Sequence, residues 1–268
     1  MIDWMRYRLI YLAISLTVIG AGVFGLFTWG LSLGIDFTGG TILEYRLPDG
    51  GTKIIRSSLI DETKREEIKE EIVRFENVGP AIGPELIKKT VYALAISALA
   101  ILLWIAYQFK SIKFGISATL ATLHDSLVLL GSFSLLGHFA GAEVDFLFVT
   151  AMLTILSFSV HDTIVVYDRI RESQKKFGLR PGGAYGPEGG MLGLANWAVS
   201  ETMVRSLNNS FTIIFMLVAL VLLGGETVRW FAVALLIGTV SGTYSSPFVA
   251  VPILVTWDEI EKRFRVRK

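Results

Sequence analysis

Six blocks of about 20 predominantly apolar residues lie along this chain, and each is long enough to cross the hydrocarbon core of a bilayer as a helix. They make the chain unusually apolar, because 52% of its 268 residues are hydrophobic. A backbone in lipid must satisfy its own hydrogen bonds, which favours helices. The sequence therefore predicts an all-α polytopic membrane protein with six transmembrane helices, at Leu9–Trp29, Lys89–Gln108, Phe114–Leu136, Val144–Tyr167, Glu201–Leu223 and Trp230–Trp257.

The first block has the position of a signal peptide, and the last block is interrupted by prolines. The first is about 20 residues long and no small-residue cleavage pattern follows it, so it is predicted to be retained rather than removed as a signal peptide. The last contains Pro247 and Pro252. Because proline removes a backbone donor and clashes with the preceding turn, a kink or bend is predicted there.

Basic residues are placed unevenly, although the formal net charge is only +1. The turns after the third and fifth blocks together hold only Arg229, whereas Lys and Arg cluster before the first block, after the second and fourth, and at the C-terminus. Loops rich in Lys and Arg stay in the cytoplasm. Both termini are therefore predicted to be cytoplasmic, with residues 36–88 facing outward. The absence of cysteine excludes disulfides and thiol chemistry.

Four parts follow from this topology. Residues 1–35 hold the cytoplasmic N-terminus and the first helix, and residues 36–88 form the extracytoplasmic segment. Residues 89–257 hold helices two to six with a cytoplasmic loop at 168–200, and residues 258–268 form a basic cytoplasmic tail. Within that loop, Gly178–Gly193 is rich in glycine and proline, which predicts a mobile segment.

The first half of the outward segment has the pattern of a β-hairpin. Apolar and polar residues alternate over 42–47, the sequence Pro-Asp-Gly-Gly at 48–51 supplies a turn, and residues 52–57 can return as a second strand. A segment of about 50 residues buries little core and is marginal alone. We therefore expect it to lean on a partner or on the membrane.

The second half of the outward segment has the pattern of an amphipathic helix. Thr63 and Glu66 form a capping box, and Ile68, Ile72 and Phe75 then recur at helical spacing among charged residues. The segment between the first two spanning helices is thus predicted to be small and α+β.

Three charged residues lie within the predicted spans, namely Asp125, Asp162 and Arg205. A carboxylate at the centre of a membrane helix costs about 2.5 to 3.5 kcal/mol even on a lenient insertion scale. Asp162 and Arg205 both lie roughly 9 Å from the cytoplasmic ends of consecutive antiparallel helices, at about 1.5 Å per residue. An ion pair between them is therefore geometrically available, whereas Asp125 lies nearer the bilayer centre.

Two interpretations of the Asp162 and Arg205 pair stay open. Desolvation favours a protonated carboxyl and a guanidinium favours an ionised one, so movement of Arg205 would switch Asp162 between binding and releasing a proton. The alternative is a static pair that fixes helix packing. Asp125 serves either in transport or as a carboxyl hydrogen-bonded to hydroxyls of adjacent helices. His161 is either a second proton carrier or a packed, hydrogen-bonded histidine.

Other motifs in the spans have structural interpretations. Histidine precedes aspartate at His124-Asp125 and at His161-Asp162, but adjacent helical residues point about 100° apart, so neither dipeptide chelates a metal alone and no metal site is predicted. Gly238-x-x-x-Gly242 is typical of a surface that packs closely against another helix.

The motifs, taken in order, resemble the SecD/SecF family of protein-export membrane subunits, which is related to the resistance-nodulation-division transporters. Gly34-Ile35-Asp36-Phe37-Thr38-Gly39-Gly40 is similar to the family's glycine signature after the first span, and Leu123-His124-Asp125 to its third-span motif. The most specific likeness is His161 to Glu172, which includes Asp168, Arg169 and Arg171. Around the sixth span, Gly224-Gly225 and Leu236 to Ser246 complete the pattern.

This resemblance implies a SecF-like subunit that works with SecD beside the SecYEG channel in the bacterial inner membrane. It implies that the proton-motive force helps to complete export of unfolded preproteins, that Asp162 and Arg205 take part in proton conduction, and that SecD supplies a further aspartate. No cofactor other than protons and no nucleic acid is implied. Family members carry a larger ferredoxin-like outward domain, so residues 36–88 would be a truncated form of it.

Three other classes of function remain to be weighed. A non-conducting scaffold that holds SecD and the channel together would tolerate Asp162→Asn, whereas a relay would fail. A small-molecule exporter of the resistance-nodulation-division type would need a large outward substrate domain, which this chain lacks. An enzyme is least expected, because the outward segment has neither histidine nor cysteine.

Overall fold

The structure is a computed structural model, and it describes residues 3–46, 52–57, 72–78, 82–177 and 190–266. Six helices of this part are long and apolar enough to cross a membrane, which confirms the predicted fold class. The spanning elements are α1 (Arg8–Thr28), α4 (Ile82–Phe109), α5 (Ile112–Ala140), α6 (Phe146–Phe177), α7 (Gly190–Leu223), and α8 (Glu226–Ser245) continued by α9 (Val251–Val266).

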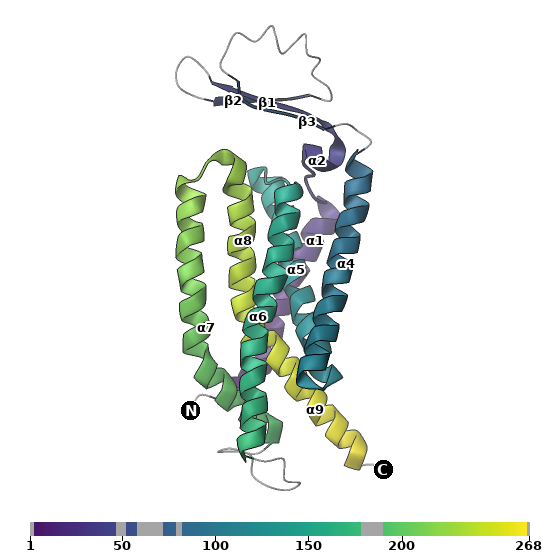
Figure 1. Cartoon of the computed structure of the whole chain (residues 1–268), viewed down its shortest axis with the longest axis vertical. Coiled ribbons are helices and arrows are strands. Elements are labelled where there is room, and N and C mark those ends of the chain that lie inside the picture. The colour runs from purple at the N-terminus through teal and green to yellow at the C-terminus, as the bar shows by residue number, and fades with distance from the viewer. Residues whose placement is uncertain (1–2, 47–51, 58–71, 79–81, 178–189, 267–268) are drawn as a thin grey trace.

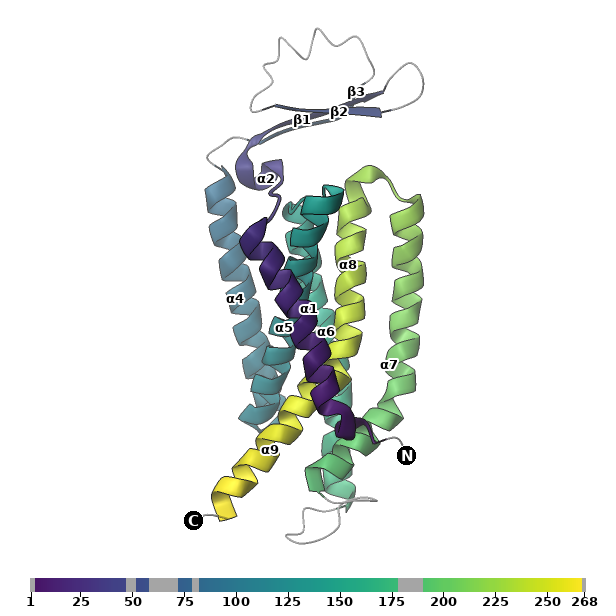
Figure 2. The same ribbon diagram turned by 180° about the vertical axis from the view of Figure 1, so that it is seen from behind.

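The helices form an upright bundle with a small β-sheet at one end (Figure 1). Both termini lie at the opposite end, and α7 and α8 stand together at one edge while α4 stands at the other, as Figure 2 shows from behind. A one-turn helix α2 (Ile35–Thr38) joins α1 to the sheet. The sheet is therefore separated from both termini by the length of the bundle.

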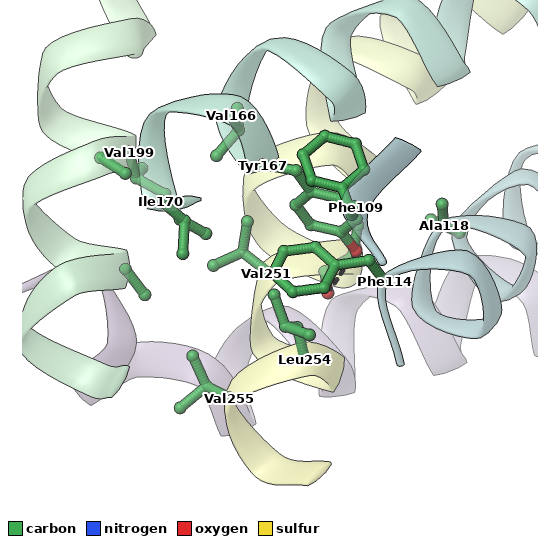
Figure 3. Close-up of a cluster of buried hydrophobic side chains, with 14 of the residues drawn as sticks. Phe109, Phe114, Ala118, Val166, Tyr167, Ile170, Val199, Val251, Leu254 and Val255 are labelled. Carbon is green, nitrogen blue, oxygen red and sulfur yellow. Dashed lines mark hydrogen bonds between the residues drawn. The ribbon is translucent and has the colours of Figure 1, made fainter. Parts of the chain in front are cut away.

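Aromatic rings fill the core near the end where the termini lie (Figure 3). Phe109 stacks on Phe114 with centroids 5.1 Å apart, and Tyr167 meets both rings edge-on. The Tyr167 hydroxyl lies 2.6 Å from Ser117 Oγ and donates to the carbonyl of Ala250. This buried polar tip is satisfied, so the ring joins its own helix α6 to α4, α5 and the turn Ser246–Ala250 without an unpaired group.

Close packing between α6 and α8 uses the predicted small-residue motif. A Cβ added at Gly238 would overlap Ile155 on α6, and one added at Gly242 would lie 3.1 Å from Cβ of Ser159. The prediction that Gly238-x-x-x-Gly242 lets another helix approach is confirmed. α8 can therefore place its serines directly against α5 and α6.

Three strands form an antiparallel sheet in the order β2-β1-β3, with β1 (Gly40–Arg46) in the centre and β2 (Thr52–Ser57) on one edge. The β1–β2 pairing confirms the predicted hairpin. The third strand is β3 (Ile72–Val78), so the predicted amphipathic helix is wrong at Ile72 and Phe75. Pairing with β1 overrides the local helical spacing, with Leu43 opposite Phe75. Residues 63, 66 and 68 of that helix lie outside the described residues.

Helices at the end of the bundle near the termini are longer than predicted. α6 continues to Phe177 and α7 begins at Gly190, so most of the loop predicted at 168–200 is helical, and residues 178–189 lie outside the described residues. The predicted kink is confirmed. A π-helical turn, η2 (Ser246–Ala250), contains Pro247 and separates α8 from α9.

Candidate functional site

Asp162 lies about halfway along α6, on the side that meets α7. Its residue is only 4% exposed, and its Oδ2 accepts a hydrogen bond of 2.8 Å from Ser206 Oγ on α7. The Asp162 side chain forms no ion pair within the described part of the chain. A buried carboxyl held by a neutral hydroxyl can take up or release a proton without breaking a salt bridge.

Arg205 does not pair with Asp162, so the expected ion pair is absent from this structure. The two residues lie on neighbouring helices as predicted, but Ser206 faces Asp162 and the preceding residue points about 100° away around α7. Arg205 is exposed and lines a polar cavity of about 380 Å³ with Asp168, Glu172 and Glu201. The two residues lie at a similar level along α6 and α7, as predicted, but the Arg205 side chain points in a different direction around α7.

Arg169 joins α6 to α7 beside that cavity. Its Nε donates to Glu201 Oε2 at 2.7 Å, a second guanidinium nitrogen contacts Glu201 Oε1, and a further one contacts Glu172. The guanidinium also lies 4.5 Å from the ring centre of Trp197. Arg205 therefore shares its cavity with Glu172 and Glu201, which already pair with Arg169.

Arg171, two residues further on, points to a different helix. Its Nη1 donates to the carbonyl of Gln108 at the end of α4, over a distance of 2.9 Å. The motif from Asp168 to Glu172 thus ties α6 to α7 through Arg169 and to α4 through Arg171. These bonds fix the level of Asp162 in the bundle.

Asp125 is completely buried and held by hydroxyls from two other helices. Ser159 on α6 and Ser245 on α8 donate to Oδ2, Ser241 on α8 donates to Oδ1, and all three distances are 2.6 Å. This is the hydrogen-bonded carboxyl that the sequence offered as one of two interpretations. Its position between α5, α6 and α8 also leaves a transport role open to test.

Removing one of these hydroxyls is expected to destabilise the bundle. Ser241→Ala leaves a buried carboxyl oxygen with one donor fewer, which costs about 1 to 3 kcal/mol. We expect thermal unfolding in detergent at a lower temperature than for the parent protein. Ser157→Ala is the matched control, since Ser157 is exposed on α6, and it should unfold like the parent. Equal stability of the two variants would contradict a structural role for the Asp125 cradle.

His161 is exposed on the surface of α6 and forms no hydrogen bond with the described residues, so it is not the packed histidine that was one interpretation. His124 is buried instead, with Nδ1 3.1 Å from Asp125 Oδ1. Within the described part of the chain, no three histidine, aspartate or glutamate residues gather closely enough to hold a metal ion.

The glycine signature anchors the sheet to the bundle. Asp36 Oδ2 accepts the backbone N–H of Phe146, 2.8 Å away, at the start of α6. Gly34 donates its N–H to the carbonyl of Val144. Gly39 and Gly40 have φ angles of 73° and 131°, which favour glycine, and they turn the chain into β1. The motif therefore connects strand β1 mechanically to the helix that carries Asp162.

The serines around both aspartates were not predicted from the sequence. Ser206 follows Arg205 directly, and Ser241 and Ser245 are four residues apart on one face of α8. The sequence does contain a signal for them, namely two serines four residues apart next to a glycine motif that allows close helix packing. The sequence does not show that these serines bond to Asp125, because that depends on how α8 packs on α5.

Comparison with known proteins identifies the family. The family model described as protein export membrane protein SecD/SecF, C-terminal, matches residues 59–260, and the SecD/SecF GG motif matches residues 24–47. The protein translocase subunit SecF of Thermobaculum terrenum is 38% identical over 96% of this chain and 94% of its own length. That of Anaerolinea thermophila is 34% identical over 98% of this chain and 96% of its own.

The crystal structure of SecDF from Thermus thermophilus matches the fold with a TM-score of 0.83 and 29% sequence identity. The match covers 96% of this chain but only 39% of the SecDF chain. The Thermobaculum alignment extends over 314 residues, more than the 268 of this chain, so that relative carries residues that this chain lacks. The chain belongs to the SecD/SecF family of protein export membrane proteins.

Proposed function

We propose that this chain is a SecF-type subunit of the Sec protein-export machinery. It works with SecD beside the SecYEG channel and uses the proton-motive force to help complete the export of unfolded preproteins. The family membership and the similarity to proteins named SecF support this assignment. We further propose that the protein lies in the bacterial inner membrane with both termini in the cytoplasm, which the distribution of Lys and Arg supports.

The observation that carries the proton-coupled part of the proposal is the setting of Asp162. This carboxyl is buried at the contact of two helices, and within the described part of the chain its hydrogen-bond partner is a neutral hydroxyl. Arg205 lines a polar cavity close by on α7. A rotation of α7 about its axis would exchange Ser206 for Arg205 at Asp162, and the arrival of a guanidinium favours release of the proton.

The available energy is sufficient for such a step. One elementary charge that crosses 100 mV of membrane potential yields about 2.3 kcal/mol, which can bias a two-state conformational equilibrium. The link from Asp36 to the first residue of α6 gives the sheet a direct mechanical connection to the helix of Asp162. A shift of α6 would therefore be passed to β1.

Complementation tests this function. Cells depleted of their own SecF-type subunit and supplied with this chain should export a secreted reporter, and an ionophore that collapses the proton gradient should remove the gain. The chain should also be recovered with SecD after purification from membranes. Export restored equally with and without the ionophore would contradict proton coupling and leave the scaffold interpretation.

Arg205→Gln is expected to remove the ionophore-sensitive part of export. Because Arg205 is exposed and forms no ion pair within the described residues, the variant should still reach normal membrane levels. Arg229→Gln is the control, since Arg229 is also partly exposed but lies at the other end of the bundle beside Glu226. Equal export by both variants would exclude Arg205 from the coupling step.

A further inference from the structure

His124 on α5 is a buried histidine of which only one ring nitrogen is used by the protein. The residue is 7% exposed, and Nδ1 lies 3.1 Å from Asp125 Oδ1. The other nitrogen, Nε2, is buried and has no hydrogen-bond partner among the described residues. Buried polar atoms are nearly always paired, so an unpaired one indicates a partner such as water or a transferable proton.

Two hollows meet at His124. One of about 570 Å³ runs between α1 and α9, and the other, of about 390 Å³, lies between α1, α5 and α8. Ser15 of α1 lines both hollows, Thr256 also lines the larger one, and Ser241 and Tyr244 also line the smaller one. The larger hollow extends to Arg8, near the end of the bundle where the termini lie, and Arg8 pairs with Glu259 at 3.0 Å. His124 can therefore be reached from that end without passing Asp162.

The bonds around Asp125 fix which nitrogen of His124 carries the proton. Three serine hydroxyls already donate to the two carboxyl oxygens, so both oxygens act as acceptors. A carboxylate only accepts, so Nδ1 of His124 donates to it, and Nε2 of the neutral ring is left as an acceptor. This acceptor belongs to a ring that is next to a buried negative charge.

Few other groups face this pair. From α8, the Tyr244 ring lies 6.2 Å from the His124 ring, and its hydroxyl donates to the carbonyl of Tyr11 on α1. From α6, Ser159 is the contact, and Asp162 is three residues further along that helix with Ser206 as its partner. From α9, Glu259 is paired with Arg8. Among the residues that the structure describes, no Lys or Arg contacts Asp125, so an added proton is the charge that can balance it.

We propose that His124 and Asp125 together form a second proton-binding site, distinct from Asp162 and open to the hollow beside α1. A hydronium ion in the hollow transfers a proton to Nε2, and water is left. The ring becomes an imidazolium that still donates from Nδ1 to the Asp125 carboxylate, and the charge of the pair changes from −1 to 0. The proposal rests on the proposed proton-coupled function, to which it adds a site on another face of the bundle.

Nitrogen NMR of the histidine rings tests this directly. The chain has three histidines, and His138 and His161 are exposed, so His138→Gln and His161→Gln identify the remaining signal as His124 without disturbing the core. In the full-length parent protein, we expect the His124 signal to show a neutral ring protonated at Nδ1 at high pH. It should gain a proton on Nε2 when the sample is acidified over the range in which histidine side chains change charge.

Asp125→Asn removes the negative charge and should abolish the gain of the Nε2 proton over the same range. Unchanged signals from His138 and His161 would show that the variant is folded. A parent protein in which His124 never gains the proton would overturn the proposal, and so would a gain that persists in Asp125→Asn. Repeating the titration in Asp162→Asn separates the two sites: uptake at His124 should survive there, whether or not Asp162 proves essential for export.

Discussion

Export driven by the proton-motive force should be lost in Asp162→Asn, while the protein still assembles. Asparagine keeps the size of the side chain and can still accept the bond from Ser206 Oγ, but it cannot ionise. Export should therefore fall to the level seen with an ionophore. Because one charge crossing 100 mV supplies about 2.3 kcal/mol, the loss of rate can reach about 50-fold. The measurement is export of a secreted reporter in cells depleted of the native subunit.

Two controls make this result specific. Membrane levels and recovery with SecD must match those of the parent chain, which excludes misassembly. Asp162→Glu keeps an ionisable carboxyl at the same position and should retain part of the gain. Full export by Asp162→Asn would sink the assignment of this carboxyl and leave a scaffold as the better account.

Gly131→Ala is expected to destabilise the bundle severely, because α1 and α5 touch through backbone atoms. A Cβ added at Gly131 would lie 2.5 Å from Cα of Gly22, and one added at Gly22 would lie 2.8 Å from Cα of Gly131. Since neither contact is with a flexible side chain, the helices themselves must separate. Overpacking of this kind costs about 1 to 3 kcal/mol or more. We expect a lower unfolding temperature in detergent and reduced membrane levels.

Gly20→Ala is the matched control, on α1 two residues before the Gly22 that Gly131 touches. A Cβ at Gly20 has nothing within 4 Å, so this variant should unfold like the parent. If Gly131→Ala were as stable as Gly20→Ala, the crossing of α1 and α5 would have to differ from the one described.

The membrane helices could be predicted from sequence because the hydrocarbon core of a bilayer favours apolar side chains along the whole length of a span. Their ends could not, since helices continue past the membrane wherever the local residues allow it. α6 keeps its helical form through Lys175 and Lys176, well beyond the apolar block. The kink after Ser245 was predictable because proline acts through its own covalent structure.

The sheet shows where local patterns fail. Its hairpin could be predicted from alternation and a nearby turn, since β1 and β2 are adjacent in sequence. β3 could not, because Ile72 and Phe75 also fit a helical spacing and only pairing with β1 decides between the two. Whether this segment forms a strand depends on contacts between residues about 30 positions apart, and a short stretch of sequence does not contain both partners.

The meeting of α6 and α7 at Asp162 could be predicted from the sequence, but the contacts of this carboxyl could not. Counting residues along a helix gives the level of a side chain, and Asp162 does meet α7 at the expected level. It does not give the direction around the helix, which is why Ser206 rather than Arg205 faces the carboxyl. The serines around Asp125 come from two helices and meet it only through close packing at Gly238 and Gly242.

Proton conduction by the purified protein tests the central claim most directly. The chain would be reconstituted with SecD into vesicles that contain a pH-sensitive dye, and a proton gradient would be imposed across the membrane. The account predicts acidification with the parent chain and a rate at the background of empty vesicles with Asp162→Asn. Equal acidification by the two proteins would contradict it, because a proton path that does not need this carboxyl cannot run through Asp162.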